Sequence, residues 1–154
     1  IPAGGILFRD SSLLSIIGKS GDYIGRGRLK FTTLFGTRPA SPAVDVWAAM
    51  KSLGRSGYRT IVKNCMDNAM RLYEDLKRLK DVHLLVKPTM NIIGFSCSKV
   101  DDGLVVDRLL ERGWVLSLFP THIRVVVMPH TNAQHLKVFV SDLEEVLESF
   151  ENHV

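Results

Sequence analysis

The chain has 154 residues, of which 45% are hydrophobic and 23% charged, values that are typical of a globular domain and exclude an intrinsically disordered protein. Its net charge of +4 and pI near 9.2 are not gathered into a continuous basic stripe with interleaved aromatic residues, so a solvated surface is favoured over nucleic-acid binding. No apolar run is long enough to span a bilayer and the first residues do not resemble a signal peptide, so we expect a cytoplasmic protein that binds no membrane.

The first ten residues, Ile1 to Asp10, form two short apolar pieces around an Ala-Gly-Gly turn, without a polar lead-in or a helix cap. A free terminus is usually polar and frayed, because nothing offsets the entropy of ordering it. We therefore expect the chain to be the C-terminal part of a larger protein, with a strand end at Ile6 to Phe8. Residues 11–40 are rich in Gly, Ser and Thr and only weakly periodic, which predicts a loop-rich segment.

Two helices are predicted after this segment. Ser41 is a favourable N-cap, Pro42 suits the first helical position, and Gly54 is typical of a helix end. A second helix is predicted from Tyr58 to Leu79, because apolar residues recur there at helical spacing. The expected apolar faces consist of Val46, Trp47, Met50 and Leu53 in the first helix, and of Ile61, Val62, Cys65, Met66, Ala69, Leu72, Tyr73, Leu76 and Leu79 in the second.

The remainder of the chain alternates between strand-like and helix-like patterns. Strands are predicted at Val82–Val86, Asn91–Cys97, Trp114–Phe119 and Ile123–Met128, and helices from Asp101 or Asp102 to Arg112 and from Thr131 or Asn132 onward. Short turns between the paired strands favour antiparallel hairpins. The resulting order predicts an α/β fold of the α+β type, with a small, mixed, mostly antiparallel sheet covered by helices.

Motifs that identify an enzyme by spacing alone are absent, since the sequence has no HExxH, P-loop, Rossmann fingerprint or GxSxG. The five histidines are scattered without metal-ligand spacing, so no metal site is predicted. Cys65 and Cys97 lack CxxC spacing and lie in apolar segments, which predicts two reduced core thiols. Four features remain as functional candidates, namely the Gly4-Gly5 turn, Tyr23, the turn from Gly36 to Pro39, and Arg124.

Arg124 lies within an apolar strand, where side chains alternate between the two faces of a sheet. Ile123, Val125 and Val127 should share one face, and Arg124 should lie on the other. A permanently charged guanidinium beside apolar side chains needs a carboxylate or water. Two interpretations are open, a rim position with the charge in solvent and a bidentate clamp for a substrate carboxylate.

Gly36 and Thr37 form a small turn with free amides and a hydroxyl, placed just before the Ser41 helix start. Such a turn can hold a phosphate, although a plain connection between loop and helix is the simpler interpretation. Tyr23 lies between Gly21 and Gly25, which indicates a loop position. An exposed loop tyrosine usually has no function, but one that closes over a site can deliver a proton.

Together these features resemble the pyridoxal 5'-phosphate (PLP)-dependent group II amino-acid decarboxylases, in particular the archaeal tyrosine/aspartate decarboxylases, and the related sphingosine-1-phosphate lyases. Pro2-Ala3-Gly4-Gly5-Ile6-Leu7-Phe8-Arg9-Asp10 is similar to the strand that follows the family's cofactor lysine, and Phe35-Gly36-Thr37-Arg38 to its Gly-Thr/Ser-Arg turn. Gly54-Arg55-Ser56-Gly57-Tyr58 resembles its Gly-x-x-Gly-Tyr helix junction. Arg124-Val125-Val126-Val127-Met128-Pro129-His130 resembles its C-terminal Arg-Ile-Val-Val-Met-Pro-His strand.

The resemblance implies the C-terminal part of a fold-type-I, aminotransferase-like enzyme that decarboxylates an L-amino acid of the tyrosine, aspartate or glutamate type. Residues 1–40 would be a remnant of the large PLP-binding domain, and residues 41–154 the small domain. Gly36 and Thr37 would bind the PLP phosphate of the neighbouring subunit in a homodimer. Arg124 would bind the substrate carboxylate, and Tyr23 would protonate the intermediate left by loss of CO₂.

The chain departs from the family in one respect that bears on its activity. The lysine that binds PLP lies in an Asp-x-His-Lys motif, which the family places just before the segment matching Ile1, and no lysine in this chain follows a histidine. The resemblance therefore implies a partner that supplies it, either the N-terminal part of the same polypeptide or a companion chain. Two alternatives stay open: a carbon–carbon lyase of the sphingosine-1-phosphate type, which the Arg38-Pro39 pair also fits, and a non-catalytic dimerisation or regulatory module.

Overall fold

The computed structural model describes residues 6–21, 30–32 and 39–151. The chain divides into two compact units, Ile1–Arg55 and Ser56–Val154. The division expected from the sequence, between residues 40 and 41, concerns the domains of the complete protein and stays a prediction.

The described part of the first unit contains a short helix, α1 (Leu13–Ile17), and two short strands, β1 (Lys19–Ser20) and β2 (Lys30–Phe31). The strands pair in antiparallel fashion, with Lys19 opposite Phe31. Ile6 to Phe8 do not form the expected strand end, because no described segment pairs with them, and Leu7 is 98% exposed.

Helix α2 (Ser41–Leu76) begins one residue before the predicted first helical position, because Ala40 rather than Ser41 accepts the first helical hydrogen bond, from the Val44 amide; the helix is interrupted at the predicted glycine. Gly54 has φ 58° and ψ −175°, a left-handed φ that side chains other than glycine rarely adopt. Helical structure resumes immediately after Gly54, three residues earlier than expected, and ends at Leu76 rather than Leu79. Two predicted helices therefore form, separated by one glycine instead of a short loop.

The second unit contains a four-stranded antiparallel sheet in the order β3-β4-β6-β5. Its elements, in addition to the C-terminal half of α2, are β3 (Val82–Leu84), β4 (Ile92–Cys97), α3 (Asp102–Glu111), β5 (Ser117–Phe119), β6 (His122–Val126) and α4 (Ala133–Glu151). The predicted element order and antiparallel pairing are confirmed. The predicted helix starts are also confirmed, since Asp101 accepts a hydrogen bond from the Gly103 amide and Asn132 accepts one from the His135 amide.

Several strands are shorter than predicted. The strand expected from Trp114 begins only at Ser117, because Trp114 turns toward the helices. Its indole Nε1 donates a hydrogen bond to Asp142 Oδ2 at 2.7 Å, and its ring lies edge-on to Phe139 at 5.3 Å. The side chain therefore ties the entry to β5 to helix α4.

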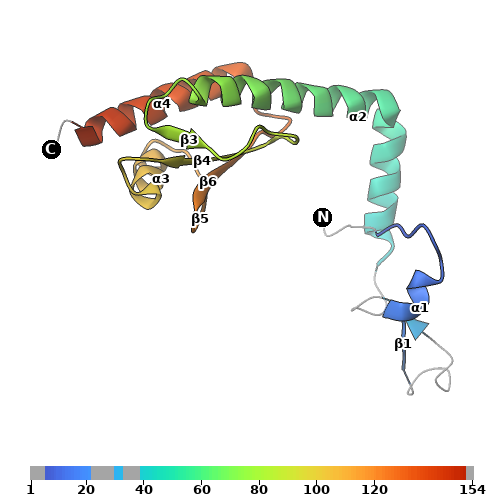
Figure 1. Cartoon of the computed structure of the whole chain (residues 1–154). Coiled ribbons are helices and arrows are strands. Elements are labelled where there is room, and N and C mark those ends of the chain that lie inside the picture. The colour runs from blue at the N-terminus through green and yellow to red at the C-terminus, as the bar shows by residue number, and fades with distance from the viewer. Residues whose placement is uncertain (1–5, 22–29, 33–38, 152–154) are drawn as a thin grey trace. The chain divides into compact units, whose positions relative to one another are not determined.

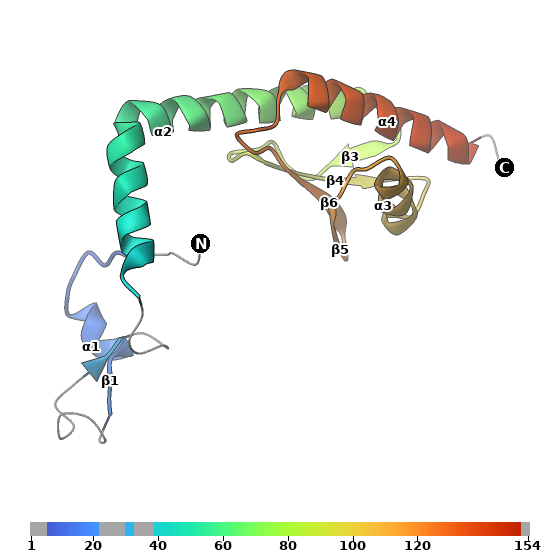
Figure 2. The same ribbon diagram turned by 180° about the vertical axis from the view of Figure 1, so that it is seen from behind.

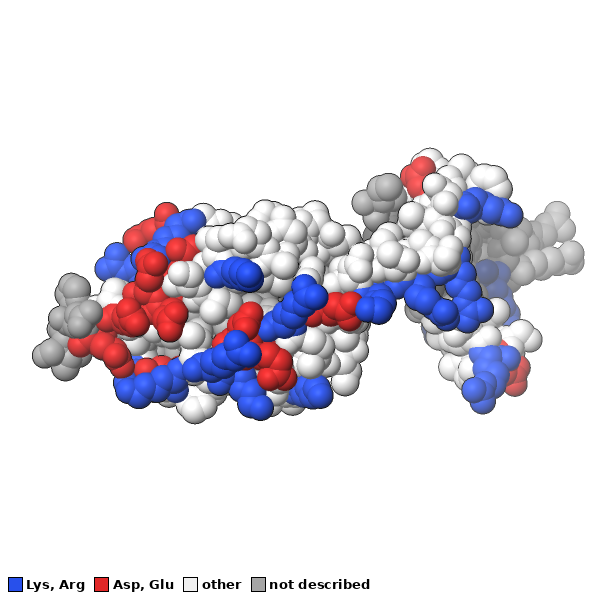
Figure 3. Space-filling view, turned by 90° about the horizontal axis from the view of Figure 1, so that it is seen from above, with Lys and Arg blue, Asp and Glu red and all other residues white. Residues whose placement is uncertain are grey.

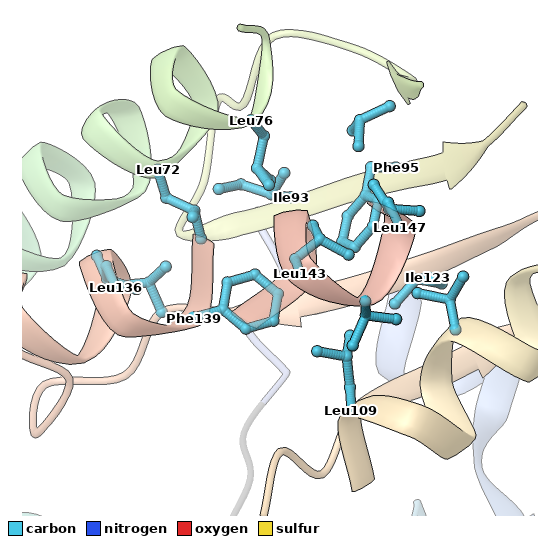
Figure 4. Close-up of a cluster of buried hydrophobic side chains, with 14 of the residues drawn as sticks. Leu72, Leu76, Ile93, Phe95, Leu109, Ile123, Leu136, Phe139, Leu143 and Leu147 are labelled. Atoms are coloured by element: carbon cyan, nitrogen blue, oxygen red, sulfur yellow. The ribbon is translucent and has the colours of Figure 1, made fainter. Parts of the chain in front are cut away.

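The helices of the second unit cover one face of the sheet. In Figures 1 and 2, α4 and the C-terminal half of α2 lie side by side along that face. The buried cluster joins Leu72 and Leu76 of α2, Ile93 and Phe95 of β4, Leu109 of α3, Ile123 of β6, and Phe139 and Leu143 of α4 (Figure 4). Each large side chain fully buried in this way contributes about 1.5–3 kcal/mol to stability.

Charged side chains of both signs are interspersed over the helical face of the second unit (Figure 3). Several form ion pairs, such as that of Arg112 with Asp142 at 2.9 Å and with Glu145 at 2.8 Å. None of the helices in the described ranges combines the length and the apolar character needed to cross a lipid bilayer.

Candidate functional site

Strand β6 presents Arg124 on the sheet face opposite the helices. Ile123 and Val127 are fully buried in the core, whereas Val126 and Met128, which share the face of Arg124, are 36% and 43% exposed. The predicted alternation is confirmed. Arg124 itself is half-buried.

The ladder places one neighbour on each side of Arg124, Gly94 of β4 and Ser117 of β5. Arg124 Nη2 donates a hydrogen bond to Ser117 Oγ at 3.3 Å. A Cβ atom at position 94 would lie 2.8 Å from Leu85 Cδ1 and 3.3 Å from His122 Cδ2, so these two side chains lean over the glycine. Glycine at this position therefore leaves space that the neighbouring side chains use.

An aromatic pair lies beside the guanidinium. The guanidinium carbon of Arg124 is 4.8 Å from the centre of the Phe119 ring, a distance typical of a cation–π interaction. Phe119 in turn stacks on His122, with ring centres 4.9 Å apart and planes only 7° from parallel. The Nδ1 atom of His122 lies 3.1 Å from Thr121 Oγ1. Ser117, Phe119, His122 and Arg124 thus form one cluster at the β5–β6 edge of the sheet.

Within the described residues, the charge of Arg124 is not neutralised. Its hydrogen bond goes to a neutral hydroxyl, no carboxylate forms an ion pair with it, and its Nε is buried without a hydrogen-bond partner. A buried N–H left without a partner costs about 1–3 kcal/mol. Arg112 gives the contrast, because two carboxylates hold it. The sheet face at Arg124 can therefore attract an anionic group. This unpaired charge favours the interpretation of Arg124 as a clamp for a carboxylate over that of a rim position with its charge in solvent.

The two cysteines are free thiols, as predicted. Cys65 is buried and Cys97 half-buried. Burial, followed by the nearby Asp102 carboxylate and a hydrogen bond to it, raises the pKa of Cys97 to about 12. Such a thiol stays protonated at neutral pH, so Cys97 is not a candidate nucleophile.

Three of the predicted site residues, Tyr23, Gly36 and Thr37, lie outside the described residues, as does the Gly4-Gly5 turn. Their roles stay predictions. Phe119, His122 and Ser117 were not predicted from the sequence to lie beside Arg124. The sequence does indicate that Phe119 and His122 are neighbours, because two strands separated only by Pro120-Thr121 bring the residues flanking that turn opposite each other.

No family model matches the chain. It is 38% identical over 146 residues to the L-aspartate decarboxylase of Thermococcus kodakarensis, which covers 95% of this chain and 38% of the relative. It is 36% identical to the L-aspartate/L-glutamate decarboxylase of Pyrococcus horikoshii, over 96% of this chain and 38% of the relative. A probable L-tyrosine/L-aspartate decarboxylase of Methanothermobacter thermautotrophicus is 38% identical over 95% of this chain and 40% of the relative.

Solved structures agree with these sequence matches. A sphingosine-1-phosphate lyase of Burkholderia pseudomallei superposes with a TM-score of 0.80 at 26% identity, over 92% of this chain and 32% of that one. The Lactobacillus brevis glutamate decarboxylase superposes with a TM-score of 0.70 at 20% identity, over 87% and 33%.

The predicted resemblance to the group II decarboxylases and the predicted fold class, that of a part of a fold-type-I enzyme, are both confirmed by these matches. The chain spans about two fifths of the length of the curated relatives it matches.

Proposed function

We propose that this chain, which has the sequence and fold of a part of the PLP-dependent group II amino-acid decarboxylases, belongs to an enzyme that removes CO₂ from an L-amino acid. The substrate is of the aspartate, glutamate or tyrosine type, as the names of the matched relatives suggest. The reaction converts the amino acid to an amine and CO₂, with one proton taken up at the α-carbon.

The observation that carries this proposal is the guanidinium of Arg124, which keeps its full charge on a half-buried sheet face. A carboxylate can accept two parallel hydrogen bonds from a guanidinium, and the planar geometry fixes its orientation. Arg124 therefore binds the α-carboxylate of the substrate and orients the bond that breaks.

PLP, when bound, supplies the electron sink for the carbanion left by loss of CO₂. The described residues fit this chemistry in one respect, since Arg124 provides a free cationic position for the acidic end of the substrate. Gly36 and Thr37 would hold the cofactor phosphate of the neighbouring subunit through backbone amides and a hydroxyl. Tyr23 would deliver the proton to the α-carbon. The lysine that would bind PLP is expected from a segment outside this chain, which spans about two fifths of the length of its curated relatives.

A second candidate function is carbon–carbon cleavage of the sphingosine-1-phosphate lyase type. The superposition with such a lyase, at a TM-score of 0.80 and 26% identity, favours it. The same guanidinium would then face a phosphate rather than a carboxylate. The identity to named decarboxylases is higher, 36–38% over nearly the whole chain, so decarboxylation is the preferred proposal.

The test uses the complete protein that contains this chain, supplied with PLP. It is incubated separately with L-aspartate, L-glutamate, L-tyrosine and a phosphorylated long-chain amino alcohol, and CO₂, amine and aldehyde are measured. We expect CO₂ and amine in equal amounts from one or more of the amino acids. Aldehyde from the amino alcohol would replace the proposal with the lyase function, and no turnover of any substrate would favour the non-catalytic module.

A matched pair of variants links the activity to the site. Arg124→Met should lower kcat/KM, whereas Arg108→Met, which removes an exposed arginine paired with Glu111 on α3, should leave it unchanged. Equal kcat/KM in both variants would show that the reaction does not depend on Arg124.

A further inference from the structure

We propose that Phe119 and His122 are positioning residues for Arg124, and that their stacked rings set the direction in which the guanidinium meets the substrate carboxylate. This inference rests on the proposed function and deepens it, because it identifies what holds the carboxylate-binding group in place.

The stacked rings of Phe119 and His122 form a platform for Arg124, and the turn between β5 and β6 brings the two rings together. Phe119 and His122 are opposite each other in the ladder, so their side chains project from the same face of the sheet. Arg124 follows two residues after His122 and therefore shares that face. The result is a continuous stack, with His122 against Phe119 and Phe119 against the guanidinium of Arg124.

The chemistry of the supporting groups suits a ligand-binding arginine. Ser117 accepts one hydrogen bond from Nη2, and the Phe119 ring lies against the guanidinium carbon. Both contacts restrict the orientation of the side chain, and neither cancels its charge. A carboxylate in the same place would hold the guanidinium equally well but would compete with the substrate. A neutral hydroxyl and an aromatic face avoid that competition.

Gly94 and Thr121 hold the imidazole ring of His122 in place. The absence of a side chain at Gly94 lets His122 lie close to the sheet, since a Cβ atom would come within 3.3 Å of its Cδ2. The Nδ1 atom of His122 pairs with Thr121 Oγ1 at 3.1 Å, which restrains rotation of the imidazole. Phe119, against which the imidazole lies, is 38% exposed and does not belong to the helix-covered core, so its ring contributes less to the stability of the unit than a buried core side chain does.

The experiment replaces each ring in the complete PLP-loaded enzyme and measures kcat, KM and the thermal midpoint. Phe119→Leu removes the aromatic face, and Phe119→Tyr retains it. His122→Leu removes the stacked ring, and His122→Phe retains a flat one. Leu118→Ala is the control on the same strand, because its side chain lies on the other face of the sheet.

We expect Phe119→Leu to raise KM by about three- to thirtyfold, the range that corresponds to loss of a cation–π contact, with a smaller change in kcat. His122→Leu should change KM in the same direction and by less. The ring-retaining variants should keep KM within about twofold of the wild type, and the thermal midpoint should change little in all of them, because neither ring belongs to the buried core. A KM for Phe119→Leu equal to that of the control would overturn the proposal.

A second readout does not depend on catalysis. Phenylglyoxal modifies arginine side chains, and peptide mass mapping gives the rate at Arg124. Loss of the Phe119 ring should uncover the guanidinium of Arg124 and increase this rate about three- to thirtyfold, while the rate at Arg108 stays constant. If no amino acid is turned over, the proposed function fails, and an unchanged modification rate in Phe119→Leu then rejects the platform separately.

Discussion

Gly94 lies directly opposite Arg124 in the ladder that joins β4 to β6, although the two positions are thirty apart in the sequence. The missing side chain at position 94 leaves space over the sheet, and Leu85 and His122 use it. The face proposed to bind a carboxylate therefore depends on the glycine at this position.

This relationship predicts the effect of Gly94→Ala in the complete enzyme. The new methyl group would come within 2.8 Å of Leu85 Cδ1, the flexible end of an exposed side chain that can move, and within 3.3 Å of His122. We expect KM for the amino acid to rise about two- to tenfold, within the range of a weakened cation–π contact, while the thermal midpoint changes little. Ser96→Ala, on the same strand and face, is the control, and an equal KM in the two variants would contradict the prediction.

Thr37→Val tests the proposed phosphate contact, which lies outside the described residues. Loss of a hydrogen bond to a charged group costs about 1.5–3 kcal/mol, equivalent to about one to two decades in affinity. Titration of the complete apo-protein with PLP, followed by absorbance or fluorescence, gives the dissociation constant. Thr33→Val is a control from the same region, and an unchanged PLP affinity in Thr37→Val would return Thr37 to the simple loop interpretation.

The loss of stability at low pH should depend on Asp142. The hydrogen bond from Trp114, and after it the hydrogen bond and charge of Arg112, hold the pKa of this carboxyl below its usual value of 3.8. A depressed pKa in the folded state means that the stabilisation is present above the unfolded pKa and is lost as the pH falls through the folded pKa. We expect the urea midpoint of the wild type to decrease below about pH 4, and Asp142→Asn to show a flatter decrease. Glu144→Gln is the control. If the urea midpoint decreases with falling pH as steeply in Asp142→Asn as in Glu144→Gln, this role of Asp142 is contradicted.

Cys97 should be inert toward thiol reagents in the folded protein. Burial first, and then the Asp102 carboxylate with which it interacts, raise the pKa of its thiol to about 12 from 9.0. Because only the thiolate reacts, labelling by iodoacetamide at pH 8, mapped by mass spectrometry, should be far slower at Cys97 in folded protein than in urea-unfolded protein. Asp102→Asn should accelerate it only partly, since burial is the larger cause. Rapid labelling of Cys97 in the folded wild type would disprove the assignment.

Much of the second unit could be predicted from the sequence because its signals are local. Gly54, Asp101 and Asn132 mark helix boundaries through hydrogen bonds and backbone angles that involve only neighbouring residues. The alternation of apolar residues around Arg124 depends only on strand geometry, so its face was predictable as well.

The parts that could not be predicted depend on long-range packing. The strand order β3-β4-β6-β5 and the position of Gly94 beside Arg124 follow from pairing between distant segments. Trp114 is of a residue type that is common in strands, but its hydrogen bond to Asp142 draws it toward α4. Ile6 to Phe8 are apolar without a described partner strand, so their composition alone predicted a strand incorrectly.

The central claim is that the guanidinium of Arg124 binds the α-carboxylate of the substrate. The most direct test is a thermodynamic cycle in the complete enzyme, with one change in the protein, Arg124→Met, and one in the ligand, replacement of the α-carboxylate by its neutral α-amide. Dissociation constants are measured for the amino acid and for its α-amide, using the amino acid that the enzyme turns over, in both proteins and in Arg108→Met.

The claim predicts that the wild type and Arg108→Met bind the carboxylate about ten- to a hundredfold more tightly than the amide, as expected for a charge-assisted hydrogen-bonded pair, and that Arg124→Met binds the two ligands equally. If Arg124→Met still prefers the carboxylate by the same factor as the wild type, another residue binds it and the claim is wrong.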